Sequence, residues 1–413
     1  MNTNNTGRTG KARWAFAGIL ATIVGTVLAL GPTATAGAGE VPATNAQRRI
    51  LGDRLSHFGA KAPAARLRAA AQTGGAEIFL YGIDAFGTKG AFAVGDILEN
   101  GAERPSARMY NGRRWNPVPV QDPGVMSGLT AVSAISAKRA YAVGFQMGST
   151  VQPLIEQFNG ASFSTMPSPD VPGGMLLGVD AISATDVYAV GLGPSGQLIE
   201  HFDGNAWSVV PGPALPQGML VSVQAVSPSN VWAVGAYRDG DVFKTLIQHF
   251  DGNAWTVVDS PAPDAKRSML SSVSVVTAND IWAVGYTNPT GGAFQDKTLI
   301  MHYDGKTWTQ VSSPNLGHGK NALWSVDAVR AGNVWAVGET AGGTLIQHYD
   351  GKRWTIDSRT RKGTESGETL YGVAAASKKS VFAIGGCVED SGTNSMEYYA
   401  MVNHFNGNTW LSN

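Results

Sequence analysis

The sequence predicts an all-β chain in which one four-stranded unit is repeated seven times. Three features support this prediction: a glycine that ends an apolar segment at regular intervals, a leucine at a fixed distance before it, and an Asn-Gly or Asp-Gly turn followed by an aromatic residue. The first such glycine, Gly95, and the last, Gly385, are 290 residues apart over six intervals. The mean period of about 48 residues suits a four-stranded unit.

The first two strands of each unit, which we label A and B, are the most regular part of the repeat. A leucine always lies 15 residues before the repeat glycine, as Leu220 does before Gly235. Strand B ends in segments such as VWAVG or IWAVG, which are too short for helices and too apolar for exposed strands. A short polar turn, for example 227–230 (SPSN), separates the two strands.

The second half of each unit contains strands C and D and the turn between them. Strand C reads LIQHF at 246–250, and an Asp-Gly pair and Trp255 follow it. Asn-Gly and Asp-Gly pairs between apolar runs favour hairpins because both residues tolerate positive φ. The turn pairs lie at 111–112, 159–160, 203–204, 251–252, 304–305, 350–351 and 406–407.

One such four-stranded sheet cannot bury both of its faces alone, so neighbouring units must stack, and seven of them can close a ring. The predicted fold is therefore a seven-bladed β-propeller of four-stranded antiparallel blades over residues 77–413. The chain ends three residues after Trp410. The last strand D is therefore either short or completed by the segment around Glu77 and Leu80.

Over 77–413 the chain resembles the galactose-oxidase-like and kelch-like propellers. The resemblance lies in the apolar strand that ends in Gly, the variable loop, the aromatic-Asp-Gly turn and the downstream Trp. Kelch units carry a glycine pair, which only Gly385-Gly386 preserves here. The turn also resembles the Asp box of sialidase-type propellers, which place one residue between Asp and Gly where this sequence has none.

The N-terminus has the features of an export signal. Arg8, Lys11 and Arg13 precede an apolar run at 14–30, and small residues that fit an A-x-A cleavage site follow it. We expect a signal peptide at 1–38 and a secreted, extracellular protein; an uncleaved membrane anchor is the alternative. Residues 39–76 are rich in Ala and Arg and predict a linker or short helix.

Composition excludes several classes of protein. Charged residues make up 15% of the chain and the formal net charge is zero, so we expect no nucleic-acid partner and, after signal cleavage, no membrane partner. The single cysteine, Cys387, excludes an internal disulfide framework and a multi-cysteine zinc site. We expect no metal, no cofactor and a monomer.

Residues that recur once per unit occupy equivalent places around a ring and cannot converge on one small substrate. We therefore interpret the turn Asp, the Trp of strand D and the repeated His of strand C as structural. The alternative for the Trp is a lectin in which every blade stacks an indole on a sugar. The repeated histidines are His201, His249, His302, His348 and His404, with Gln157 and Met109 in their place in units 2 and 1.

The irregular loops are the better candidates for a site. The spacing from the repeat glycine to the turn varies from 12 to 21 residues, and the D–A loops also vary. In a meander the B–C and D–A loops share one face, so we predict binding there. The predicted binding residues are Arg238, Asp239, Asp241, His318, Lys320 and Arg361; Arg267 belongs to the wider set of loop charges.

No enzyme motif is present: there is no H-E-x-x-H, G-x-S-x-G or P-loop sequence. The predicted function is a secreted, non-catalytic binding or interaction module for a glycan, a cell-wall polymer or a protein. The alternative is an extracellular glycan-active hydrolase or lyase. That alternative needs three arginines, or two carboxylates about 5–10 Å apart, at the axial mouth.

Overall fold

The computed structural model describes residues 76–215, 217–261, 263, 265–292, 295–358, 367–390 and 396–412. Within these ranges the regular structure consists of strands alone, and no helix there is long and apolar enough to cross a membrane. The predicted signal peptide (1–38) and, apart from Ala76, the predicted linker or short helix (39–76) lie outside the described residues.

The described strands fall into seven units of four, which we number in chain order. Units 1 to 4 contain β1 (Glu77–Ala85), β2 (Ala91–Glu99), β3 (Ala102–Tyr110), β4 (Trp115–Val118); β5 (Met126–Ser136), β6 (Arg139–Met147), β7 (Val151–Phe158), β8 (Phe163–Thr165); β9 (Met175–Ser183), β10 (Asp186–Gly193), β11 (Gly196–Phe202), β12 (Trp207–Val209); β13 (Gly218–Ser227), β14 (Asn230–Asp239), β15 (Val242–Phe250) and β16 (Trp255–Val257). Units 5 to 7 contain β17 (Arg267–Thr277), β18 (Asp280–Asn288), β19 (Lys297–Tyr303), β20 (Trp308–Val311); β21 (Asn321–Arg330), β22 (Asn333–Thr340), β23 (Gly343–Tyr349), β24 (Trp354–Ile356); β25 (Thr369–Ser377), β26 (Ser380–Asp390), β27 (Met396–Phe405) and β28 (Trp410–Ser412).

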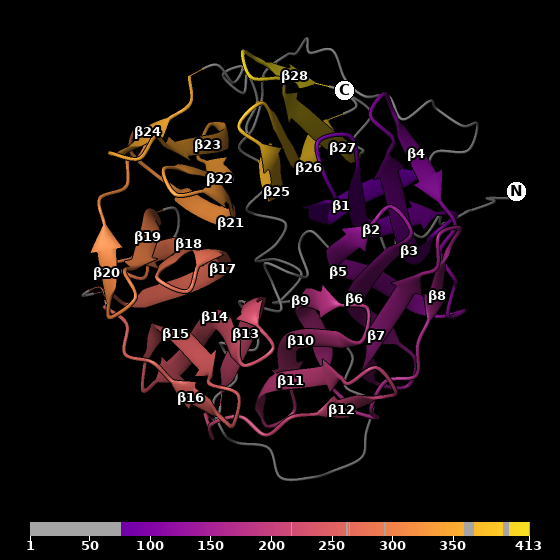
Figure 1. The fold of residues 1–413 in the computed structure, drawn as a ribbon. Helices are drawn as coiled ribbons and strands as arrows, with labels where there is room; N and C mark the ends of the chain where they lie inside the picture. The colour runs from indigo at the N-terminus through magenta and orange to yellow at the C-terminus, as the bar shows by residue number, and fades with distance from the viewer. Residues whose placement is uncertain are drawn as a thin grey trace, which may run out of the picture.

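Each unit is an antiparallel meander, and the units are arranged around a common centre (Figure 1). Units 4 and 5 count as one eight-stranded sheet because a single parallel pair, Phe243 with Arg267, joins β15 to β17. The strand A of every unit contacts the strand A of the next, and β1 contacts β25, β26 and β27. The last strand D, β28, is short and pairs with β27, whereas Glu77 to Leu80 pair with β2.

A bulge in strand A explains both the repeat leucine and the repeat glycine. In unit 1, Leu80 pairs with Gly95 and Gly82 pairs with Val94, so Tyr81 is left without a partner in the register. The same shift occurs after the leucine of every unit. A methyl group on Gly95 would lie 1.9 Å from the carbonyl oxygen of Phe79, so this close crossing of strands requires glycine.

The Asp-Gly turns are structural, as predicted. Asp251 Oδ1 accepts hydrogen bonds from the amides of Asn253 (2.8 Å) and Ala254 (3.0 Å), and Gly252 has φ of 93°. The Asp or Asn of every other unit accepts the equivalent two amides. The turn therefore needs a side-chain acceptor and does not need its charge.

The aromatic residue that opens strand D packs between units. Trp308 lies edge-on to Trp232 of the preceding unit, with centroids 5.7 Å apart, and is 5% exposed. The equivalent pairs are Phe163–Phe92, Trp207–Tyr141, Trp255–Tyr188, Trp354–Trp282, Trp410–Trp335 and Trp115–Phe382. The structural interpretation of these residues is confirmed, and a sugar-stacking role for the buried indoles is wrong.

The repeated histidines make hydrogen bonds inside each sheet, also as predicted. His249 Nε2 lies 2.9 Å from Asn230 Oδ1, and its ring stacks on Trp232 at 4.2 Å. The other four pair in the same way with Asp186, Asp280, Asn333 and Ser380. In unit 2 the replacement, Gln157, donates from Nε2 to the Tyr141 hydroxyl at 2.7 Å.

Candidate functional site

The strands nearest the centre of the ring surround a cavity of about 590 Å³. The bulge residue of every unit lines it, because the bulge turns that side chain away from the sheet and toward the axis. These seven residues are Tyr81, Thr130, Leu177, Val221, Ser271, Trp324 and Tyr371. We call this space the axial cavity. It is the place where chemically different residues occupy one repeat position.

The bulge residues of the axial cavity wall are aromatic in units 6, 7 and 1 and non-aromatic in units 2 to 5. Tyr81 and Tyr371 of units 1 and 7 lie edge-on, with centroids 5.8 Å apart, and Trp324 of unit 6 lies edge-on to Tyr286 at 5.8 Å. Units 2 to 5 contribute Thr, Leu, Val and Ser. Ser271 is 6% exposed and its hydroxyl has no hydrogen-bond partner among the described residues.

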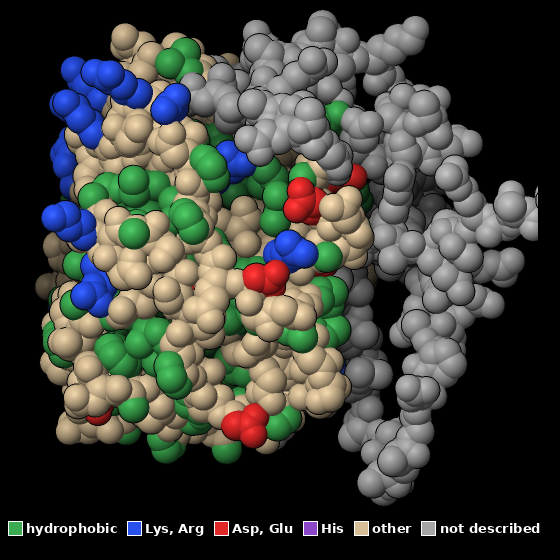
Figure 2. Space-filling model, turned by 90° about the vertical axis from the view of Figure 1, so that its right-hand side faces the viewer, with side chains coloured by type: hydrophobic (Ala, Val, Ile, Leu, Met, Phe, Trp, Pro, Cys, Tyr) green, Lys and Arg blue, Asp and Glu red, His purple; other side chains and the backbone are tan. Residues whose placement is uncertain are grey.

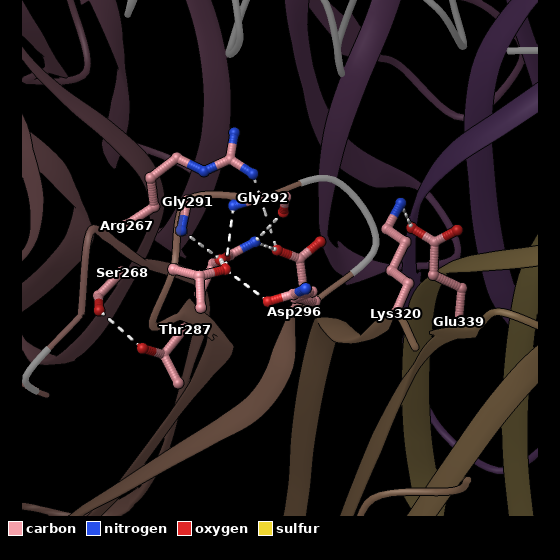
Figure 3. Close-up of polar contacts among 11 residues, drawn as sticks. Arg267, Ser268, Thr287, Gly291, Gly292, Asp296, Lys320 and Glu339 are labelled. Atoms are coloured by element: carbon pink, nitrogen blue, oxygen red, sulfur yellow. Dashed lines mark hydrogen bonds and ion pairs between the residues drawn. The ribbon is translucent and has the colours of Figure 1, made fainter. Parts of the chain in front are cut away.

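We call the end of the disc formed by the B–C and D–A connections the loop face. There, Lys320 binds Glu339 at 2.6 Å (Figure 3). Glu339 Oε1 also accepts a hydrogen bond from Trp324 Nε1 (3.1 Å), and Glu339 Oε2 accepts one from the Thr369 hydroxyl (3.2 Å). The ammonium group of Lys320 lies 5.8 Å from the centroid of the Trp324 ring. The carboxylate therefore fixes the indole and the ammonium at the cavity wall.

A second charged pair lies beside the first, in unit 5. Arg267 lies 3.8 Å from Asp296 Oδ1, with its side chain 41% exposed. Asn288 Nδ2 donates to the same carboxylate oxygen at 2.7 Å, and Asn288 Oδ1 accepts the amide of Gly291 at 2.8 Å. Figure 3 shows the two pairs on neighbouring units, and all four residues line the axial cavity. This part of the wall offers an ammonium and a guanidinium, each held by one carboxylate.

An apolar cluster packs behind the wall of the axial cavity, and among its buried methionines Met269 alone lines the cavity. Its buried members include Phe79, Phe145, Met175, Met219 and Met269, one from each of units 1 to 5. Partly buried residues that pack against this cluster include bulge and neighbouring residues of the cavity wall. Methionine side chains adapt to differently shaped partners, and they are frequent at surfaces that bind peptides.

Toward the opposite end, a belt of polar side chains joins the units. We call that end, formed by the A–B and C–D turns, the turn face. Asp84 Oδ2 accepts a hydrogen bond from the backbone amide of Ala134 in the next unit at 2.7 Å. Equivalent bonds join Ser133 to Ala181, Asp180 to Ala225, Gln224 to Val275, Ser274 to Ala328 and Asp327 to Ala375. In unit 7 the position is Ala374, and the Ala85 amide bonds to Asp84 Oδ1 instead.

Three carboxyl groups of this belt border the axial cavity at one level. Burial raises the pKa of Asp84 to about 7 and the pKa values of Asp180 and Asp327 to about 6, partly offset by the amides that bond to them. The negative charge of Asp327 and Asp180 adds to the shift of the Asp84 pKa. The half of the axial cavity nearer the turn face therefore carries a negative charge that increases as the pH rises through neutrality.

The structure brings one of the predicted site residues, Lys320, to the axial cavity. Arg238, Asp239 and Asp241 lie in the β14–β15 hairpin, away from the cavity lining. Arg238 contacts Asp241 at 3.5 Å, and Lys244 neutralises Asp239 at 2.6 Å. His318 is exposed in the β20–β21 loop, and Arg361 lies outside the described residues. A binding role for these five residues stays a prediction.

The residues that sequence reasoning missed are the bulge residues and Glu339. The pattern that points to them is variability inside a constant block: the position after the repeat leucine holds Tyr, Thr, Leu, Val, Ser, Trp and Tyr. Because the bulge adds one residue in every unit, the spacing from the repeat leucine to the repeat glycine stays constant and does not reveal it. Arg267 is the one arginine among the described lining residues, so the described wall does not supply three converging arginines. In this part of the chain no group of three or more His, Cys, Asp or Glu side chains could hold a metal ion.

Comparison with known proteins identifies the fold. No protein-family model and no curated protein matches the chain. The structure of YCF48 bound to D1 peptide is similar, with a TM-score of 0.50 and 16% identity over 76% of this chain and 91% of that chain. YCF48 from Cyanidioschyzon merolae has a TM-score of 0.50 and 17% identity over 78% and 96% of the two chains. The likeness shows a β-propeller, and the kelch-like subtype stays a prediction.

Proposed function

We propose that this chain is a secreted, non-catalytic protein-interaction module, a seven-bladed propeller that holds an extended protein segment at the loop-face mouth of the axial cavity. The observation that carries the proposal is the non-equivalence of the seven bulge residues. A position that serves only the scaffold would keep one residue type around the ring, as the positions of the repeat leucine and the repeat glycine do. A binding wall needs different chemistry on each side.

The mouth matches the needs of a peptide ligand. Trp324 and the tyrosines offer flat apolar area at the cavity wall, where Met269 also lies. Lys320 and Arg267 offer donors to backbone carbonyls or to acidic side chains. A propeller of the same fold has been solved with a peptide bound, which makes a peptide the first ligand class to test. Secretion rests on the sequence of residues 1–38.

The test is selection of binders from a random 12-residue peptide display library by the full chain, with a glycan array in parallel. We expect selected peptides to bind at least tenfold more weakly to Trp324→Ala and to Lys320→Gln. Lys306→Gln is the matched control, because Lys306 is exposed in a C–D turn on the turn face. Circular dichroism would confirm that each variant is folded. The proposal would be refuted if the selected peptides bound Lys320→Gln and Trp324→Ala with the affinity of the parent. Binding to glycans alone would also refute it.

A further inference from the structure

The turn face is not uniform, although it is built from seven copies of one pair of turns. In each unit a residue of the A–B turn lies across from the glycine of the C–D turn. A methyl group on Gly112 would lie 3.2 Å from Lys89 Cβ, one on Gly160 would lie 3.8 Å from Lys138 Cβ, and one on Gly407 would lie 2.9 Å from Lys379 Cγ. Units 3, 4 and 5 have Thr185, Ser229 and Asn279 at this place, and unit 6 has Gly332.

The units with the lysine also lack the turn aspartate. Asn111, Asn159 and Asn406 stand in units 1, 2 and 7, where units 3 to 6 have Asp203, Asp251, Asp304 and Asp350. Both residue types accept the same two amides at similar distances, so the turn geometry does not select between them. The replacement therefore changes charge and leaves the backbone as it is.

Four more cations lie in or beside the same turns: Arg113, Arg114, Arg139 and Lys378. Arg139 is half-buried, whereas the other three and the three lysines are exposed. None of the seven forms an ion pair among those found in the described part of the chain. The turns 86–90, 111–114, 136–139, 159–162, 377–380 and 406–409 contain no Asp or Glu. In the side view of Figure 2, Lys and Arg side chains gather along one edge of the disc.

These three units come from the two ends of the repeat array but form one continuous arc. Unit 1 contacts unit 2 through β1 and β5, and unit 7 through β1 and β25. The net charge of zero therefore conceals a segregation of charge that the sequence does not show until the ring is closed. We call the seven cations on this arc the basic arc.

We propose that the basic arc docks on an anionic lipid surface. The cations spread in two directions, around the ring from unit 7 to unit 2 and outward from the A–B turns to the C–D turns. Such a spread fits a charged plane better than a linear chain or a small anion. Each Lys or Arg near an anionic bilayer strengthens binding about fivefold, so several cations together give substantial affinity. Ile135, 38% exposed near the end of β5 and three residues before Lys138, adds an exposed apolar side chain.

The test uses vesicles and variants that keep the turn geometry. The full chain is sedimented with vesicles of 30% phosphatidylglycerol in phosphatidylcholine, and with phosphatidylcholine alone to measure any contribution of the apolar run 14–30. The triple variant Asn111→Asp, Asn159→Asp, Asn406→Asp should fold, because four units of the same chain already carry Asp there. We expect it to bind the anionic vesicles at least tenfold more weakly than the parent.

Matched double variants test whether the cations of the basic arc account for the vesicle binding. Lys89→Gln with Lys379→Gln should weaken vesicle binding severalfold. Lys306→Gln with Lys352→Gln, which removes two exposed cations from the aspartate-bearing turns of units 5 and 6, should weaken it less. Equal losses in the two pairs, equal binding to both vesicle types, or unchanged binding by the triple variant would overturn the proposal. Capture of soluble polyglutamate without vesicle binding would also overturn it. Peptide binding at the loop face tests the proposed function independently.

Discussion

The indole of Trp115 lies edge-on to the ring of Phe382, with centroids 5.9 Å apart and planes at 85°, and this contact joins the first unit to the last. It repeats, between the two ends of the array, the packing that joins every other pair of neighbouring units. Tyr110 lies against the same phenylalanine at 5.0 Å. Among the described strands, the ring is thus closed by side-chain packing between units, and none of them crosses from the first unit to the last.

Truncation at this junction tests how much the closure contributes. We expect Trp115→Ala to lower the free energy of unfolding by about 3 kcal/mol, since large-to-small changes of packed aromatic residues cost this order of energy. Trp115→Phe should cost much less, because Phe163 fills the equivalent place in unit 2. Urea denaturation followed by tryptophan fluorescence and circular dichroism measures both. A loss equal in the two variants would show that ring contact at this junction is not what stabilises closure.

The repeat glycine allows a sharper test of the bulge. A methyl group on Gly235 would lie 2.0 Å from the Met219 carbonyl oxygen, which neither strand can avoid without losing the register. We expect Gly235→Ala to prevent folding or to cost several kcal/mol. Gly148→Ala is the control, because no atom lies within 4 Å of the added methyl group. Soluble expression and thermal denaturation distinguish the two, and a folded, stable Gly235→Ala protein would contradict the assigned crossing.

Glu200 is a buried acid at a position where units 4 and 6 have glutamine. It is fully buried, and neither carboxyl oxygen has a hydrogen-bond partner among the described residues. In unit 6 the equivalent Gln347 donates to the carbonyl oxygen of Pro314 at 2.9 Å. Burial raises the pKa of Glu200 to about 7, so the native state holds the carboxyl proton more tightly than the unfolded state does.

The sign of the pH effect follows from that difference. The stability that protonated Glu200 contributes is fully present below the ordinary glutamate pKa and is lost as the pH rises through about 7. We therefore expect Glu200→Gln to stabilise the protein at pH 8 and to have little effect at pH 4. Urea midpoints at the two pH values measure this. An effect of the same size at both would mean that the carboxyl group does not titrate in this window.

The sequence predicted the scaffold because the scaffold repeats. Leu220, Gly235 and Trp255 recur at fixed spacing, and period, turn chemistry and strand propensity all agree on the same unit. The cavity wall escaped prediction for the opposite reason. Tyr81 and Trp324 lie inside an apolar strand of constant length, where alternation would assign them to a sheet face, and only the backbone register reveals the bulge.

The loop residues were predicted from irregular loop length alone, which does not indicate how far a loop lies from the axis. Lys320 reaches the cavity because its D–A loop leads directly into the central strand β21. Arg238 and Asp241 lie in an equally irregular B–C loop, but that loop joins strands further from the axis, and the two side chains contact each other. Irregular length indicates a variable loop, whereas distance from the axis decides whether the loop can contribute to one site.

The polar belt joins neighbouring units through hydrogen bonds that mutation can remove. Asp180 Oδ2 accepts the Ala225 amide at 2.8 Å across the junction of units 3 and 4, and the Ser133 hydroxyl lies 3.5 Å from Asp180 Oδ1. Asp180→Ala leaves that amide without its side-chain acceptor, and we expect a loss of about 1–3 kcal/mol. Asp180→Asn keeps an acceptor oxygen and should cost less.

The two variants also differ from the parent in their response to pH. Burial raises the pKa of Asp180 to about 6, so its protonated form is favoured in the native state, and the parent should lose stability as the pH rises from about 4 to 6. Asn cannot titrate, so the stability of Asp180→Asn should vary less with pH over this range. Urea midpoints of the three proteins at pH 4, 5, 6 and 7 provide the measurement. Parallel pH profiles for the parent and Asp180→Asn would show that the pKa of this carboxyl group is the same in the folded and unfolded states.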